Sequence, residues 1–139
     1  NVANMGLKQR LVAGIVPPNV VVADSANCID IINNSMSKEE MLAIINSKLL
    51  NWYFKRTSTN NHVNIYELEN LPIRTFPKDV GIEVKQLVSE MIHLNSESNP
   101  NASLIERGIS TQNSLDVIVF DLYGIDSAQA DLIKSEISS

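Results

Sequence analysis

The stretch that most constrains this chain is 42–55, LAIINSKLLNWYFK, which holds the only Trp among 139 residues. Its apolar side chains recur at helical intervals along one face: Leu42, Ile45, Leu49, Trp52 and Tyr53. Ser37 followed by Glu40 has the spacing of a capping box, which starts helices. We therefore predict a single amphipathic helix over about residues 38 to 56. Other elements should pack against its aromatic end.

Residues 7–33 are rich in β-branched side chains, and two polar or proline-containing breaks divide them into three runs. This pattern predicts three strands joined by turns. The middle run, residues 20–22, consists of three valines, which favours a central strand covered on both faces.

The second half of the sequence has helical periodicity. Apolar stripes predict helices over about residues 79–94 and 114–123, and Gly124 is the expected stop of the second. Asp126 with Gln129 has the spacing to begin a short terminal helix. The order predicts an α+β fold, in which a small β-rich N-terminal part packs on amphipathic helices and a helical C-terminal tail follows.

Composition is that of a soluble globular protein, with 44 % hydrophobic and 19 % charged residues. No apolar run approaches the roughly 20 residues of a membrane span, so we expect no membrane contact. The single cysteine, Cys28, excludes an intramolecular disulfide, and the cytoplasm is the expected compartment. Because the sequence begins with Asn and has no start signal, we read it as a piece of a longer protein.

Charge is distributed unevenly along the chain. Residues 1–78 hold eight Lys or Arg and six Asp or Glu, a net charge of +2, whereas residues 79–139 hold three and ten, a net charge of −7. Any contact with nucleic acid should therefore involve residues 1–78, with the acidic residues 79–139 facing away or binding protein. We expect both parts to form one compact domain.

Residues that could carry catalysis are scarce. The only histidines, His62 and His93, have no metal-ligand spacing, and no Gly-rich phosphate loop is present. We therefore expect a non-catalytic chain with no cofactor and no metal site of its own.

Three stretches, in order, resemble a known family. They are 42–55 (LAIINSKLLNWYFK), 68–74 (LENLPIR) and 115–125 (LDVIVFDLYGI). These are similar to the ILNSKL…YYF, L..LPIP and ID..VY.LYGL patterns in the C-terminal specificity region of TaqI-like adenine-specific DNA methyltransferases and type IIG restriction–modification enzymes. Arg74 stands where the second proline of that pattern often lies.

The resemblance implies a target-recognition domain that binds double-stranded DNA beside a methyltransferase domain of the same polypeptide. In that family, a separate domain binds S-adenosylmethionine and holds the flipped adenine with an Asn-Pro-Pro-Tyr/Phe motif. The motif is absent here, because Pro17-Pro18 is preceded by Val16 and followed by Asn19. Catalysis, S-adenosylmethionine and any Mg²⁺ would then belong to the parent enzyme.

A DNA-reading module needs Lys or Arg for phosphates and short polar side chains for base edges. The polar loop after residue 56 could supply the second kind. The predicted DNA contacts are Lys8, Arg10, Lys48, Lys55, Arg56, Ser58, Asn60, Asn61, His62 and Arg74.

Two other functions remain open from the sequence. The acidic amphipathic helices of residues 79–139 could dock a protein partner, which would make the chain an interaction or scaffolding module. The chain could also be a small enzyme that uses Cys28 or His62.

Overall fold

A computed structural model describes residues 13–16, 20–23, 27–30, 36–57, 67 and 69–138. Three strands come first: β1 (Ala13–Val16), β2 (Val20–Ala23) and β3 (Asn27–Asp30). Five helices follow: α1 (Lys38–Ile45), α2 (Lys48–Thr57), α4 (Lys78–Asn95), α5 (Ala102–Leu122) and α6 (Ser127–Ser138).

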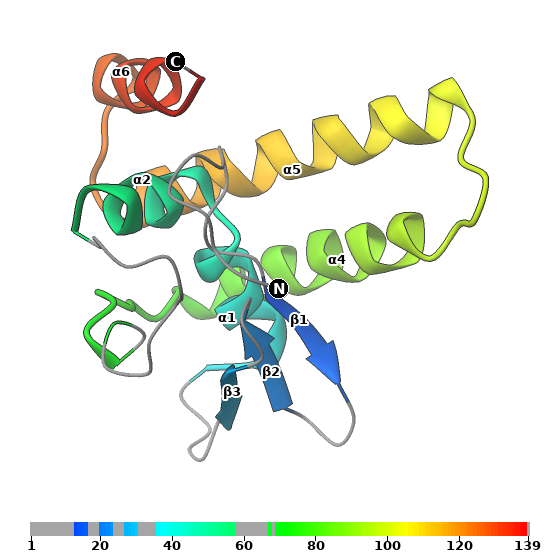
Figure 1. Cartoon of the computed structure of the whole chain (residues 1–139), viewed down its shortest axis with the longest axis horizontal. Coiled ribbons are helices and arrows are strands. Elements are labelled where there is room, and N and C mark those ends of the chain that lie inside the picture. The colour runs from blue at the N-terminus through cyan, green and yellow to red at the C-terminus, as the bar shows by residue number, and fades with distance from the viewer. Residues whose placement is uncertain are drawn as a thin grey trace.

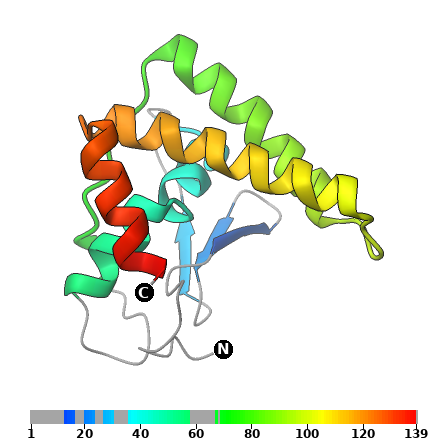
Figure 2. The same cartoon turned by 90° about the horizontal axis from the view of Figure 1, so that it is seen from above.

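The helices are arranged around α1. Figure 1 shows α4 and α5 side by side as an antiparallel pair, with α1 between this pair and the sheet. Helix α2 packs against α5, and α6 packs against α2 at the end of the molecule away from the α4–α5 connection. Seen from above, α4 and α5 converge toward their connecting loop, which projects away from the other helices (Figure 2).

The sheet is small and antiparallel, in the order β1-β2-β3. Ala13 pairs with Ala23 and Val16 with Val20, while Val20 also pairs with Asp30. The run of three valines thus begins the central strand, as its composition predicts.

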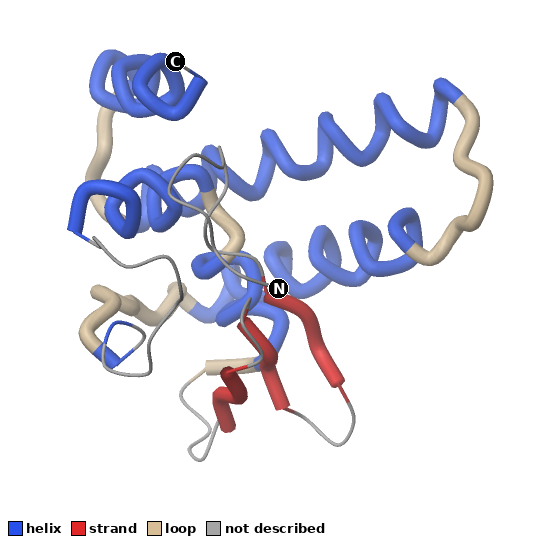
Figure 3. Tube along the Cα trace, viewed as in Figure 1, coloured by secondary structure: helices blue, strands red, loops and turns tan. Residues whose placement is uncertain are grey.

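The expected fold class, α+β with a β-rich N-terminal part, is wrong. The described residues are mostly helical, and helices occupy most of the trace in Figure 3. Even within residues 1–78, α1 and α2 hold more residues than the three four-residue strands. The β-branched runs indicated strands but not their shortness, and among the residues whose burial is described the apolar core comes mainly from the helices.

One hydrophobic core joins residues from both sides of position 78. Its most deeply buried apolar side chains are Ile44, Ile45, Leu50, Phe54, Val84 and Val119. Helix α4 approaches α1 closely at Gly81, where an added Cβ would lie 3.0 Å from Oε2 of Glu40. The absence of a side chain at position 81 therefore allows this approach.

The predicted single helix over residues 38 to 56 is two helices, with a break at Asn46 and Ser47. The Ser47 hydroxyl donates to the carbonyl of Ile44 (2.6 Å) and accepts from the amide of Leu50 (3.2 Å). Ser47 therefore closes α1 and caps α2. Because the break re-orients α2, Phe54 is fully buried, whereas Trp52 and Tyr53 are half-buried.

Asn46 ties this break to the sheet. Its side-chain oxygen accepts from the amide of Ala13 (2.7 Å), and its side-chain nitrogen donates to the carbonyl of the same residue (3.0 Å). Two hydrogen bonds to one residue fix both the position and the orientation of β1 against the helices.

Asp116 of α5 accepts hydrogen bonds from the first residue of α2. Its Oδ1 accepts from the amide of Lys48 (2.9 Å) and its Oδ2 from the Lys48 ammonium (2.8 Å), while the Asp116 side chain is only 1 % exposed. The carboxylate also lies at the positive end of the α2 dipole. A buried charge is thereby paired and hydrogen-bonded, which its burial requires.

We predict that Asp116→Ala lowers the free energy of unfolding by about 2–4 kcal/mol, because it leaves an amide and an ammonium without their partner. The exposed Asp121→Ala, on the same helix, should change it by less than about 0.5 kcal/mol. Urea denaturation measures both. Equal stabilities of the two variants would contradict this role for Asp116.

Candidate nucleic-acid interface

The C-terminal end of α2 carries two of the predicted DNA contacts. Lys55 and Arg56 lie in its last turn, where positive charges interact favourably with the negative end of the helix dipole. Leu50 and Phe54 bury the other side of the helix in the core. The core thus holds the helix while Lys55, half-buried, and Arg56, exposed, lie at its outer surface.

Arg56 belongs to a cluster with one residue of α2 and one of α6. Its guanidinium carbon lies 5.0 Å from the centroid of the Trp52 ring, within the range of a cation–π contact. Glu136 accepts from both: Oε1 from Arg56 (2.8 Å) and Oε2 from the Trp52 indole nitrogen (2.9 Å). Trp52, at the aromatic end that other elements were expected to pack against, also makes a polar contact to α6.

Lys48 lies at the opposite end of α2. Its ammonium forms the ion pair with Asp116 described above, and its side chain is 36 % exposed. The structure thus gives Lys48 a role in holding α2 against α5. Its predicted contact with DNA stays a prediction.

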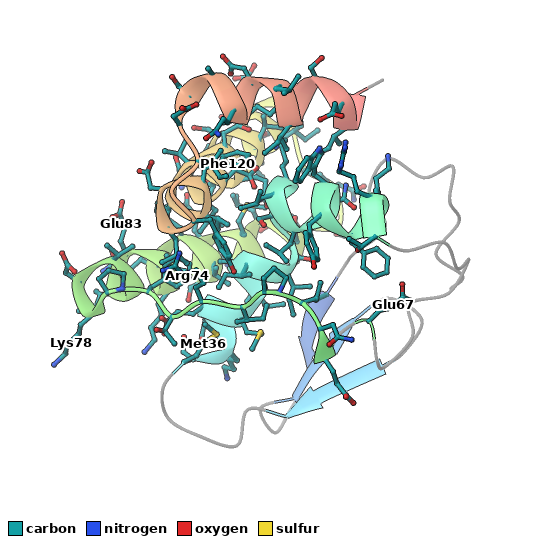
Figure 4. All side chains as sticks on the ribbon, turned by 90° about the vertical axis from the view of Figure 1, so that its left-hand side faces the viewer. Met36, Glu67, Arg74, Lys78, Glu83 and Phe120 are labelled. Carbon is teal, nitrogen blue, oxygen red and sulfur yellow. The ribbon has the colours of Figure 1, made fainter. Side chains whose placement is uncertain are left out.

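Arg74 lies in the extended segment before α4, near the centre of the view in Figure 4, and Lys78 marks the start of that helix. The Arg74 amide donates to the Tyr123 hydroxyl (3.2 Å), which in turn donates to the carbonyl of Pro72. Tyr123 therefore fixes the backbone that carries Arg74 and leaves its side chain exposed. Burial raises the pKa of Tyr123 above its ordinary value of 10.0, partly offset by the Arg74 amide hydrogen bond and charge.

The remaining predicted contacts lie outside the described residues. They are Lys8, Arg10, Ser58, Asn60, Asn61 and His62. The side chain of Cys28 is likewise outside the described part, so the hypothesis of a small enzyme stays untested.

A groove lies on another surface. It has a volume of about 470 Å³ and is lined by residues of β1, α1, α4 and α5 and of the loop after α4, among them Gly14, Asn46, Met91 and Gln112. None of the described residues that line it is Lys or Arg, so their character differs from that of the cationic end of α2.

The described ranges contain neither a metal-ligand cluster nor a membrane-spanning helix. Within them, no group of three or more His, Cys, Asp or Glu side chains could hold a metal ion. None of the described helices combines the length and the hydropathy needed to cross a membrane.

Comparison with known families gives a match over the first part of the chain. Residues 5–73 match the TaqI-like C-terminal specificity domain. The family resemblance is thereby confirmed over the first stretch and nearly all of the second. A specificity domain of this family is not itself catalytic, and the family supports a role in DNA recognition by methyltransferases. No curated protein and no solved structure matches the chain.

The third stretch, 115–125, lies outside the TaqI-like match but contacts both stretches within it. Asp116 binds Lys48 of the first stretch, and Tyr123 binds the backbone of the second at Pro72. Sequence reasoning missed Asp116, Tyr123 and Glu136 as partners. For Asp116 a signal was available, because it is a carboxylate within the apolar run 115–120.

We predict that Tyr123→Phe lowers the free energy of unfolding by about 1 kcal/mol at neutral pH, because two backbone hydrogen bonds are lost. Since the pKa of Tyr123 is raised in the folded state, its contribution is complete below pH 10.0 and is lost as the pH rises through the raised value. The stability difference between wild type and variant should therefore shrink above pH 10.0.

Urea denaturation at neutral pH and at a pH above 10.0 tests this prediction, with Tyr53→Phe as the matched control. That variant should stay within about 0.5 kcal/mol of wild type at neutral pH. A difference between wild type and Tyr123→Phe that is constant with pH would contradict the assignment.

Proposed function

We propose that the chain is the DNA target-recognition domain of a restriction–modification N6-adenine methyltransferase or endonuclease. The observation that carries the proposal is the match of residues 5–73 to the TaqI-like specificity domain. In this role the chain binds duplex DNA and positions it for a catalytic domain that lies outside it.

The parent protein in this proposal is an S-adenosylmethionine-dependent, adenine-specific DNA methyltransferase of the cytoplasm, with or without a nuclease activity of the type IIG class. S-adenosylmethionine and any Mg²⁺ bind in the parent. The second partner of the chain is the methyltransferase domain of the same polypeptide.

The proposed DNA face centres on the C-terminal end of α2. Lys55 and Arg56 supply phosphate contacts there, and the polar residues predicted to read bases, from Ser58 to His62, follow in the sequence. The exposed Arg74 is a further phosphate contact. Lys48 is a weaker candidate for a phosphate contact, because its ammonium already neutralises Asp116.

Overall charge limits what the chain can do alone. A net charge of −5 opposes the phosphate term that dominates affinity for DNA. Measurable binding by the chain should therefore require low salt, and the parent would contribute further positive charge.

We predict that Lys55→Glu/Arg56→Glu weakens binding by about ten-fold or more at low salt, to a similar extent for unrelated duplexes. The reason is that phosphate contacts carry no sequence information. The slope of log affinity against log salt should fall by about two. Fluorescence anisotropy with labelled duplexes measures both quantities.

Lys78→Glu/Lys85→Glu is the charge-matched control. Both lysines are exposed on α4, and Lys78 points outward at the start of that helix (Figure 4). This variant changes the net charge equally and should lose much less affinity. Equal losses from the two double variants would reject the proposed face.

A second candidate function, protein docking through the acidic helices, is favoured by one observation. Ile105 and Ile109 lie one turn apart on α5 and are 52 % and 58 % exposed. Exposed apolar neighbours are a feature of protein-binding surfaces.

If protein docking is the function, Ile105→Ser/Ile109→Ser should abolish recovery of a partner in a nuclease-treated pull-down. Ile82→Ser/Leu132→Ser removes two exposed apolar side chains elsewhere and should preserve recovery. Recovery that is equal with both variants would reject this surface.

A further inference from the structure

Glu136 pairs with Arg56, the cation at the centre of the proposed DNA face. Its two carboxylate oxygens bind Arg56 and the Trp52 indole, at 2.8 and 2.9 Å. Helix α6 thus places a negative charge directly against a residue proposed to contact phosphate. A DNA phosphate that binds Arg56 therefore shares the guanidinium with this carboxylate or displaces it.

We propose that Glu136 competes with DNA phosphate for Arg56 and so holds down the affinity of this face; the inference rests on the proposed function. A phosphate oxygen makes the same charge-assisted hydrogen bond to guanidinium that a carboxylate oxygen makes. When phosphate replaces Glu136, Arg56 gains a DNA contact and the carboxylate loses its contact with the guanidinium.

Exposure makes this exchange feasible. The side chains of Arg56 and Glu136 are 57 % and 40 % exposed, so water and ions reach both. Exposed ion pairs of this kind are weak. Phosphate can therefore displace the carboxylate, yet the carboxylate still lowers the apparent affinity.

Helix α6 itself need not move. Ala130 and Ile133 are buried in the core and fix α6, so only the Glu136 side chain has to rotate. Arg56 can keep its position over the Trp52 ring, 5.0 Å from the ring centroid. The stacked guanidinium is thus already oriented when the exchange takes place.

A second surface pair supplies a matched control. Glu90 of α4 pairs with Arg107 of α5, and their side chains are exposed to a similar degree. This pair belongs to the α4–α5 hairpin rather than to α2. Neutralising Glu90 therefore makes the same change in net charge away from the proposed DNA face.

The experiment measures duplex binding by the full 139-residue chain at low salt. Glu136→Gln retains an oxygen for the Trp52 indole but removes the charge. It should raise affinity by about two- to five-fold, the range set by a weak surface ion pair. The slope of log affinity against log salt should also become steeper, by up to about the amount that one phosphate contact adds. Glu90→Gln should leave affinity nearly unchanged.

Arg56→Gln and Arg56→Gln/Glu136→Gln complete a double-mutant cycle. Loss of the Glu136→Gln gain in the Arg56→Gln background supports competition at Arg56. A gain that persists there, or that Glu90→Gln reproduces, overturns it in favour of a general charge effect. Unchanged or weaker binding by Glu136→Gln, with wild-type circular dichroism, also overturns it.

The failure of the proposed function has a different signature. If Arg56→Gln binds DNA as wild type does, Arg56 is not a DNA contact, and the inference falls with it. If Arg56→Gln weakens binding but Glu136→Gln does not strengthen it, only the competition is rejected.

Discussion

The helical arrangement depends on the contact between the carboxylate of Asp116 and Lys48. The carboxylate is buried in α5, yet it accepts from the amide and the ammonium of Lys48 at the start of α2. A helix N-terminus in the interior leaves amides without partners unless other groups supply them. Ser47 supplies a second acceptor through its hydroxyl. Helix α2 can therefore begin inside the protein and end at its surface.

This arrangement brings together the three stretches that resemble one family pattern, of which the third lies outside the matched residues 5–73. Lys48 in the first meets Asp116 in the third, and Pro72 in the second meets Tyr123 in the third. Each of these two junctions joins one residue of the third stretch to one residue of another stretch. These residues preserve the frame, whereas proposed DNA contacts such as Arg56 lie at its edge.

Local signals predicted the features that local chemistry controls. The Ser37–Glu40 capping box forms, with the Ser37 hydroxyl accepting from the Glu40 amide at 3.1 Å. Asp126 and Gln129 bind each other's amides at the start of α6. Gly124 follows α5 with a φ of 70°, a conformation that glycine adopts without strain.

Features that depend on distant partners could not be predicted in this way. Residues 38 to 56 show one helical periodicity, and the break at Ser47 follows from contacts with β1 and α5 that sequence spacing does not contain. Helix α5 runs from Ala102 to Leu122 and is therefore longer than the helix predicted over residues 114–123. The candidate site was found through residue types, but the opposing charge of Glu136 comes from 80 residues further along the chain.

The paired hydrogen bonds between Asn46 and Ala13 address only main-chain atoms of β1. Every residue type except proline offers the same amide and carbonyl at position 13. The junction between sheet and helices therefore does not depend on the side chain at position 13, but it requires the side-chain amide of Asn46. Sequence drift can remodel the strand without detaching it, whereas a change at position 46 breaks both bonds together.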